Sequence, residues 1–229
     1  HAALLGALAG AAAVAGMDAP AGGFDEARRI ALGLEGGAAE PPGTWLLEEA
    51  YLKPYAGVRH AHYAAAAAQA LRARIGARRV ASARLATYGE ALRYAGNRAP
   101  GAAITAQFSL SWAVAATLTQ GDLGPAAYTD AALADPALRA LEAAVVLVED
   151  GSHPGRFATL TVTLDDGTVE TETVTSVVGD PDRPMTAAEA EAKFRRFAAP
   201  LGEARAAAIA DLLLRGAADS RAGDVLALD

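Results

Sequence analysis

Cysteine is absent from the 229 residues, and lysine is nearly so. Without cysteine the chain has no disulfides, thiol catalysis, cysteine-ligated zinc or iron–sulfur clusters. The same absence favours a reducing compartment, and we expect a cytoplasmic protein. Only Lys53 and Lys193 occur among the 20 basic residues, the rest being arginine. Because a buried lysine can lose its proton near neutral pH and arginine cannot, a lysine in this sequence merits attention. The alternative is that the two lysines occur by chance.

The sequence also lacks an excess of positive charge and any long hydrophobic run. Its 20 basic and 27 acidic residues give a net charge of −7, which argues against binding to nucleic acid or to an anionic membrane. The apolar stretch at 1–16 is interrupted by glycine and is shorter than the about 20 residues that span a bilayer, so we predict a buried helix there. No glycine-rich phosphate-binding motif is present, and we expect no nucleotide cofactor.

Alanine dominates what is present. The 62 alanines and a hydrophobic content of 52% favour helices around a sizeable core. Residues 156–164 and 168–176 alternate in polarity around Asp165-Asp166-Gly167, which predicts a β-hairpin with one solvated face. Other extended segments are expected over residues 44–52, 78–88 and 143–149. Helices are predicted over residues 1–16, 24–34, 60–75, 103–118, 130–141, 186–198 and 202–215.

The order of these elements predicts an α+β fold with an inserted domain. Residues 1–50 and 181–229 are helical and are expected to belong to a mostly helical domain, where Thr186 and Glu189 form a capping box. Between them, residues 51–180 mix helices and strands. We therefore predict that this middle part is an α+β lid domain flanked by the helical segments.

The densest chemistry lies between Lys53 and His62, directly before and within the start of a predicted helix. Arg59 and His60 lie near the helix N-terminus, where cations are unfavourable and anions are stabilised. Gly57 lets a backbone approach a ligand closely. One interpretation is therefore a carboxylate-binding site with proton-transfer groups. The alternative is a basic cluster held by acidic side chains from elsewhere. No metal site is expected, because histidines two apart on a helix do not face each other.

The segment from Lys53 to His62 resembles the KPYPxCRHxH motif of the MmgE/PrpD family, which includes 2-methylcitrate dehydratase and cis-aconitate decarboxylase. Three later segments resemble further family motifs in the same order. Residues 106–115 resemble its AQFSLPYAVA helix, residues 141–151 its L-x-x-x-V-x-V-x-x-D strand, and residues 179–194 its GxPxxPMTxxExxxKF helix start. Together these segments extend over nearly the whole chain.

The resemblance implies a mostly helical domain and a smaller α+β lid with the active site between them. The chain is similar to the C-terminal half of family members, so a second polypeptide carrying the N-terminal half is expected, in a homodimer or a heteromer. The family needs no metal or organic cofactor. It acts on small polycarboxylates by removing a proton next to a carboxylate, with loss of water, loss of CO2 or re-protonation.

The resemblance also assigns roles to residues. Lys53 and His62 are expected to be catalytic, with Lys53 contacting a substrate carboxylate or shuttling a proton. Four further residues are expected to bind substrate, namely Arg59, His60, Tyr55 and Trp112.

Some positions depart from the family pattern. Val58 stands where decarboxylase-like members carry histidine, and Trp112 stands where several members carry tyrosine. Ala56 and Gly57 or Val58 replace the usual proline and cysteine. These departures argue against cis-aconitate decarboxylase and leave the substrate open.

Three functions therefore compete. The first is a cofactor-independent lyase or isomerase completed by an N-terminal half. The second is a binding or scaffolding subunit without catalysis. The third is a stand-alone α+β domain without a ligand, in which Lys53 and His62 would be freely replaceable.

Overall fold

The computed structural model describes residues 2–33, 43, 46–216 and 223 of the chain. It divides into two units, residues 1–46 and 47–229, which are described separately. The predicted division into helical segments at 1–50 and 181–229 and a lid domain at 51–180 stays a prediction. The described helices are all too short or too polar to cross a bilayer.

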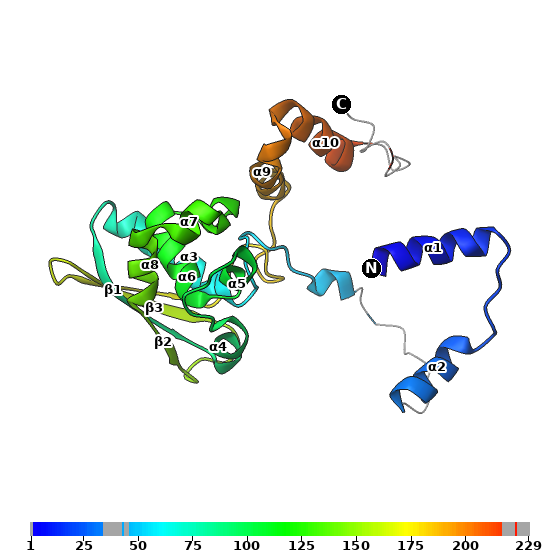
Figure 1. Cartoon of the computed structure of the whole chain (residues 1–229), viewed down its shortest axis with the longest axis horizontal. Coiled ribbons are helices and arrows are strands. Elements are labelled where there is room, and N and C mark those ends of the chain that lie inside the picture. Colours follow the sequence, from blue (N-terminus) through cyan, green and yellow to red (C-terminus); the bar gives the residue numbers. More distant parts are fainter. Residues whose placement is uncertain (1, 34–42, 44–45, 217–222, 224–229) are drawn as a thin grey trace. The chain divides into compact units, whose positions relative to one another are not determined.

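The first unit consists of two helices, α1 (Ala2–Val14) and α2 (Gly23–Leu32), shown in blue in Figure 1. Helix α1 carries no charged residue, and its leucines Leu4, Leu5 and Leu8 are 61%, 65% and 57% exposed. None of the residues of α2 is buried. This unit by itself therefore holds no core on which an apolar helix could pack, and the burial of the helix over residues 1–16 stays a prediction.

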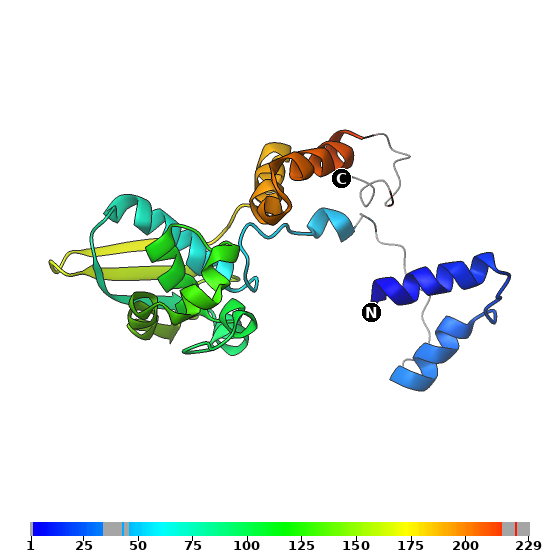
Figure 2. The same cartoon turned by 45° about the horizontal axis from the view of Figure 1, so that its top comes forward.

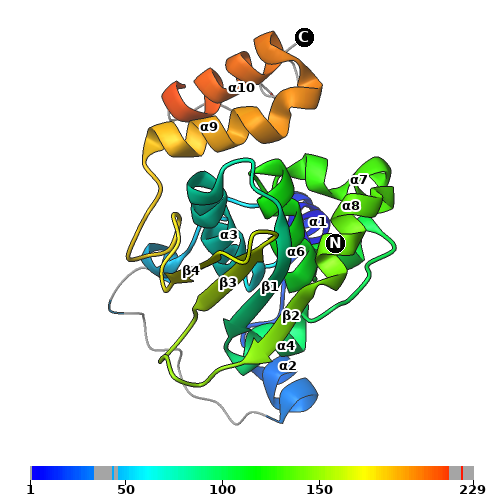
Figure 3. The ribbon, with the colours of Figure 1, turned by 90° about the vertical axis from the view of Figure 1, so that its left-hand side faces the viewer.

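The second unit is built on one mixed sheet with the strand order β2-β1-β3-β4 (Figure 3). Strands β1 (Val80–Thr87) and β2 (Val145–Glu149) are parallel, and β1 pairs antiparallel with β3 (Ala158–Leu164). Strand β4 (Val169–Val174) completes the antiparallel hairpin. The predicted hairpin and the α+β class are thus confirmed.

The two faces of the hairpin differ in character. Strand β3 alternates buried and half-buried residues, with Leu160 and Val162 fully buried on one face. On the other face, Thr159 and Thr161 form hydrogen bonds of 2.9 and 3.0 Å with threonines of β4. Alternation with period two therefore gives one apolar face and one solvated face, as the sequence predicts.

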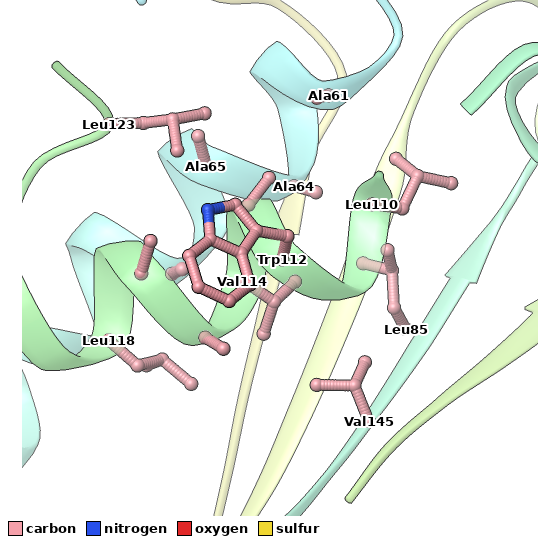
Figure 4. Packing of buried hydrophobic residues seen from close by; sticks show 14 of the residues in the cluster. Ala61, Ala64, Ala65, Leu85, Leu110, Trp112, Val114, Leu118, Leu123 and Val145 are labelled. Atoms are coloured by element: carbon pink, nitrogen blue, oxygen red, sulfur yellow. The ribbon is translucent and has the colours of Figure 1, made fainter. Parts of the chain in front are cut away.

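Three helices pack on the apolar face of the sheet: α3 (Ala61–Ile75), α6 (Leu110–Gln120) and α8 (Pro136–Ala143). Many of the residues on α3 that face α6 are alanines, and small side chains let helices approach closely. Figure 4 shows Trp112 of α6 at the centre of this core, near alanines of α3. Leu85 of β1 and Val145 of β2 close the core from the sheet side.

Several helix boundaries differ from the sequence prediction. The single helix expected over 103–118 is broken at Ser109, which accepts a hydrogen bond of 3.1 Å from the Trp112 amide and begins α6. The helix expected over 130–141 is divided because Asp135 caps a new helix that starts at Pro136. The short helices before these breaks are α5 (Ala103–Gln107) and α7 (Asp130–Ala134).

Four short elements were not predicted, one of them a 3-10 turn at Ala199–Leu201. Helix α4 (Gly89–Ala95) follows β1, and a turn of 3-10 helix spans Pro125–Tyr128. A further 3-10 turn at Leu46–Glu49 replaces part of the extended segment expected over 44–52, of which residues 44 and 45 lie outside the described residues.

The C-terminal helices α9 (Ala187–Ala198) and α10 (Glu203–Arg215) pack side by side, joined by a 3-10 turn at Ala199–Leu201 (Figure 2). The predicted capping box at the start of α9 is confirmed. Glu189 accepts a 2.8 Å hydrogen bond from the Thr186 amide, and Thr186 accepts one of 3.2 Å in return.

The hairpin provides a matched test of the core. Val162 is fully buried, whereas Val169 is 58% exposed on the neighbouring strand. Val162→Ala should lower the free energy of unfolding by about 2 kcal/mol, because it removes two buried methyl groups and leaves a cavity. Val169→Ala should change it by less than about 0.5 kcal/mol. Urea unfolding of both variants checks this, and equal losses would contradict the assignment of the two faces.

Candidate functional site

Residues 52–60, which we call the lysine segment, run in non-helical conformation into α3. Pro54 disfavours helix at Lys53, so the backbone must find partners outside a helix. It finds them at three places. The Leu52 amide donates to Gly179, the Ala56 amide to Leu123 and the Val58 amide to Gln107, each at 2.9 Å. Two loops and the end of helix α5 thus fix the path of the lysine segment.

The contact between Leu52 and residue 179 requires a glycine at position 179. Its φ of +94° is rarely adopted by other residues, and a Cβ there would overlap the carbonyl oxygen of Leu52. Gly57 is also close to neighbours, since a Cβ would lie 3.1 Å from the Tyr128 hydroxyl and 3.6 Å from Leu123. The sequence suggests that a ligand approaches the backbone at Gly57. In the structure the close neighbours of Gly57 are side chains of the protein itself.

A cavity of about 650 Å³ lies beside the lysine segment, between it and helix α9. Its polar lining comes from Lys53, Tyr55, Gln107 and Lys193, so both lysines of the sequence face one space. Lys53 is exposed and Lys193 is half-buried. The rest of the wall is apolar and is formed by Leu52, Ala56, Met185, Ala190, Phe194 and Phe197.

Helix α9 is fastened to the lysine segment by Arg196. This residue donates to the carbonyl of Pro54 and forms an ion pair of 2.9 Å with Asp122. The guanidinium also stacks over the Phe197 ring at 4.9 Å. Arg196 therefore helps to hold the two walls of the cavity together.

Tyr55 contributes a neutral phenol to the cavity. Its hydroxyl donates to Gln69 at 2.9 Å, and burial, with a smaller effect from Asp122, raises its pKa to about 12. The ring meets the His62 ring edge to face, with 5.5 Å between the centroids. Gln69 thus takes up the single hydroxyl proton of Tyr55, and the phenol packs in the wall and remains protonated at neutral pH.

His62 is fully buried on the first turn of α3 and does not line the cavity. One ring nitrogen lies 3.3 Å from the carbonyl of Gly57, and the other has no partner among the described residues. Burial, reinforced by the charge of Arg59, lowers the pKa of His62 to about 3. The imidazole is therefore neutral, and the hydrogen bond to Gly57 positions the lysine segment.

Arg59 is also buried and forms an ion pair with Asp180. Its guanidinium lies between the rings of Tyr51 and Tyr63, at 4.8 and 4.9 Å from their centroids. Asp180 in turn accepts a 3.0 Å hydrogen bond from the Val177 amide. The sequence left open whether the basic residues bind a carboxylate ligand or are held by acidic side chains of the protein. Arg59 fits the second interpretation, because Asp180 pairs with it. Sequence reasoning missed Asp180, whose only signal was its place in the motif that starts at Gly179.

His60 and Trp112 lie away from the cavity lining. His60 precedes α3, has its Nδ1 2.7 Å from the Tyr88 hydroxyl and stacks on Tyr94; burial lowers its pKa. Trp112 is fully buried, and its indole N–H donates to the carbonyl of Ala127 at 3.0 Å. Of the six residues predicted from the resemblance, the structure thus brings Lys53 and Tyr55 to the cavity, and Trp112 packs in the core.

The fold and the cavity define an α+β domain that presents two lysines and a phenol to one space. Within the described residues, no cluster of three or more histidine, aspartate or glutamate side chains is placed to hold a metal ion. The sequence of residues 55–215 matches the MmgE/PrpD C-terminal domain, and the chain belongs to the MmgE/PrpD family. A comparison with curated proteins gave no match. Membership of this family suggests dehydratase-like lyase activity.

The burial of His62 predicts a pH effect on stability. Because its folded pKa of about 3 lies below the ordinary value of 6.5, its contribution is present above pH 6.5 and is lost as the pH falls toward 3. Between pH 7 and pH 5 the free energy of unfolding should fall by about 2 kcal/mol through this group. Urea unfolding at both pH values measures this fall. In His62→Asn the fall in unfolding free energy between pH 7 and pH 5 should be about 2 kcal/mol smaller than in the wild type. The exposed control His153→Asn should keep the wild-type loss, and an unchanged loss in His62→Asn would contradict the assignment.

Proposed function

We propose that the chain is the C-terminal half or a subunit of a cofactor-independent lyase or isomerase that acts on a small polycarboxylate. The reaction class is dehydration, decarboxylation or epimerisation, started by removal of a proton next to a carboxylate. The observation that carries the proposal is the placement of Lys53, in the family motif, on a cavity that Lys193 also lines.

Proton removal next to a carboxylate forms an enediolate, which carries extra negative charge on the carboxylate oxygens. Cations aimed at these oxygens stabilise the charge as it develops. Lys53 is exposed, lines the cavity and forms no ion pair with another described residue, so its ammonium group is available for this task. Gln107 and Tyr55 line the same cavity and carry no charge at neutral pH.

The described lining of the cavity holds no histidine, aspartate or glutamate that could accept the proton. Its ionisable side chains are those of Lys53, Lys193 and Tyr55, and burial keeps Tyr55 protonated. This composition supports the proposal that a second polypeptide completes the site with further acid and base groups. We propose a homodimer or heteromer in which that polypeptide carries the N-terminal half.

A second candidate is a binding subunit that has lost catalysis. It is favoured by the burial of His62 and by the pairing of Arg59 with Asp180, which leave both away from a ligand in the cavity. In that case the cavity would bind a carboxylate without turnover.

Solvent exchange tests the catalytic role of Lys53. The native preparation, with every associated polypeptide retained, is incubated in D2O with a panel of di- and tricarboxylates and followed by proton NMR. Loss of the signal at a carbon next to a carboxylate reports proton removal. Lys53→Met should slow this loss by about 100-fold or more, because one cation at the developing charge is removed. Its unfolding midpoint should match the wild type, since the side chain is exposed.

The control is Arg205→Met, which removes an exposed cation on α10 outside the cavity lining and should leave exchange unchanged. Exchange at the wild-type rate in Lys53→Met would contradict a catalytic role for this lysine. Binding of a carboxylate with no exchange at all would favour the non-catalytic subunit.

A further inference from the structure

Glu142 of α8 is a buried carboxylate that the proposed chemistry does not use. It is 2% exposed and does not line the cavity beside the lysine segment. Its Oε1 accepts a hydrogen bond of 2.5 Å from the Ser111 hydroxyl and one of 3.3 Å from the Ala99 amide, and it lies 3.5 Å from Nε of Arg98. Because a buried charge is costly unless it is paired and hydrogen-bonded, these contacts fix the backbone on both sides of helix α5.

Ser109 extends this connection to the end of α5. Its hydroxyl donates to the Asn97 carbonyl at 2.6 Å, accepts from the Trp112 amide at 3.1 Å and lies 3.2 Å from the Ser111 hydroxyl. The Asn97 amide in turn donates to the carbonyl of Phe108 at 3.3 Å. The residues before α5 and those after it are therefore joined to each other, with the short helix between them.

The segment before α5 also holds an unfavourable backbone conformation. Ala99 has a φ of +47°, and among the residues that the structure describes it is the one non-glycine residue with a positive φ. Such a conformation persists only where the surrounding structure fixes it. The bond from the Ala99 amide to Glu142 is one such contact. The adjacent Arg98 adds others, since it donates to the carbonyls of Glu142 at 3.0 Å and Val145 at 2.8 Å.

Helix α5 matters to the site because it carries one of the three carbonyls that fix the lysine segment. Gln107 is the last residue of α5, so its carbonyl has no partner within that helix, and it accepts from the Val58 amide at 2.9 Å. Gln107 also lines the cavity with Lys53. A helix of five residues is not stable on its own, and its position depends on the contacts at its ends.

We infer that Glu142 is a positioning residue, whose carboxylate holds the Gln107 carbonyl in place for the Val58 amide and so sets the path of the lysine segment. The inference rests on the proposed function only in that this path places the lysine of the segment for its role there. The coupling itself lies within this chain and requires neither a ligand nor a second polypeptide. The amides of Leu52 and Ala56 are bound by other loops, so they should not depend on Glu142.

Amide hydrogen exchange of the isotope-labelled full chain, followed by NMR, tests the inference. The amides of Leu52, Ala56 and Val58 are compared in the same sample. Glu142→Ala should speed exchange at Val58 by about tenfold or more, because the carbonyl that accepts from this amide is no longer held. The other two amides should change by less than about twofold. Ser111→Ala removes the hydroxyl that donates to the carboxylate and should give the same selective change, including where Glu142→Ala fails to fold.

Two controls separate positioning from general stability. Glu142→Gln keeps an oxygen that can accept from Ser111, so it should return the exchange at Val58 to within about threefold of the wild type. Leu138→Ala removes a buried side chain from the same helix without touching these hydrogen bonds, and it should not single out the Val58 amide.

The exchange rates decide the role of Glu142 separately from the proposed function. Equal acceleration of the three amides in Glu142→Ala and Ser111→Ala would show a general loss of stability and overturn the inference, as would an unchanged Val58 amide. Neither result bears on the proposed function, because the sample holds this chain alone and no ligand. Conversely, a Lys53→Met variant with wild-type solvent exchange of the substrate would overturn the catalytic role of that lysine and leave the role of Glu142 intact.

Discussion

Arg59 and Asp180 form an ion pair in which each side chain is only 7% exposed. Removing a charge from water is costly, and the cost is offset only when the partner and further hydrogen bonds are well placed. Here Tyr63 donates to Asp180 and accepts from Arg59, while the Val177 amide donates to the same carboxylate. The pair therefore ties the start of α3 to the loop before α9. Breaking it on one side would leave a buried charge unpaired.

The site depends on this connection because its two cations come from the two segments that the pair joins. Lys53 precedes Arg59 in the lysine segment, and Lys193 follows Asp180 on α9. Next to the ion pair, the backbone contact between Leu52 and Gly179 holds the same two segments together. The chemistry of the chain is thus divided between two kinds of cation. Arg59 is fixed inside the fold by its planar, always-charged group, and the lysines reach a cavity on flexible stems.

Much of the fold could be predicted from the sequence because its signals are local. The hairpin follows from alternation around Asp165-Asp166-Gly167, and the start of α9 follows from the capping box at Thr186. The breaks at Ser109 and Pro136 were missed, although a serine cap and an Asp-Pro pair are themselves local signals for the start of a helix.

The site was predicted only in part. The motif drew attention to Lys53, and the structure places it on the cavity. The burial of His62 and the core position of Trp112 depend on contacts with distant segments, such as the carbonyl of Ala127. No local pattern links Arg59 to Asp180, because the two residues are far apart in the chain and meet only after folding.

The central claim is that the buried pair of Arg59 and Asp180 holds the two segments of the site together. A double-mutant cycle with Arg59→Met and Asp180→Asn, measured by urea unfolding, tests it most directly. Each single variant should lose about 3–5 kcal/mol of unfolding free energy, because one buried charge is left alone. The double variant should lose at least about 2 kcal/mol less than the sum of the two. Additive losses would show that the two side chains act independently and would contradict the account.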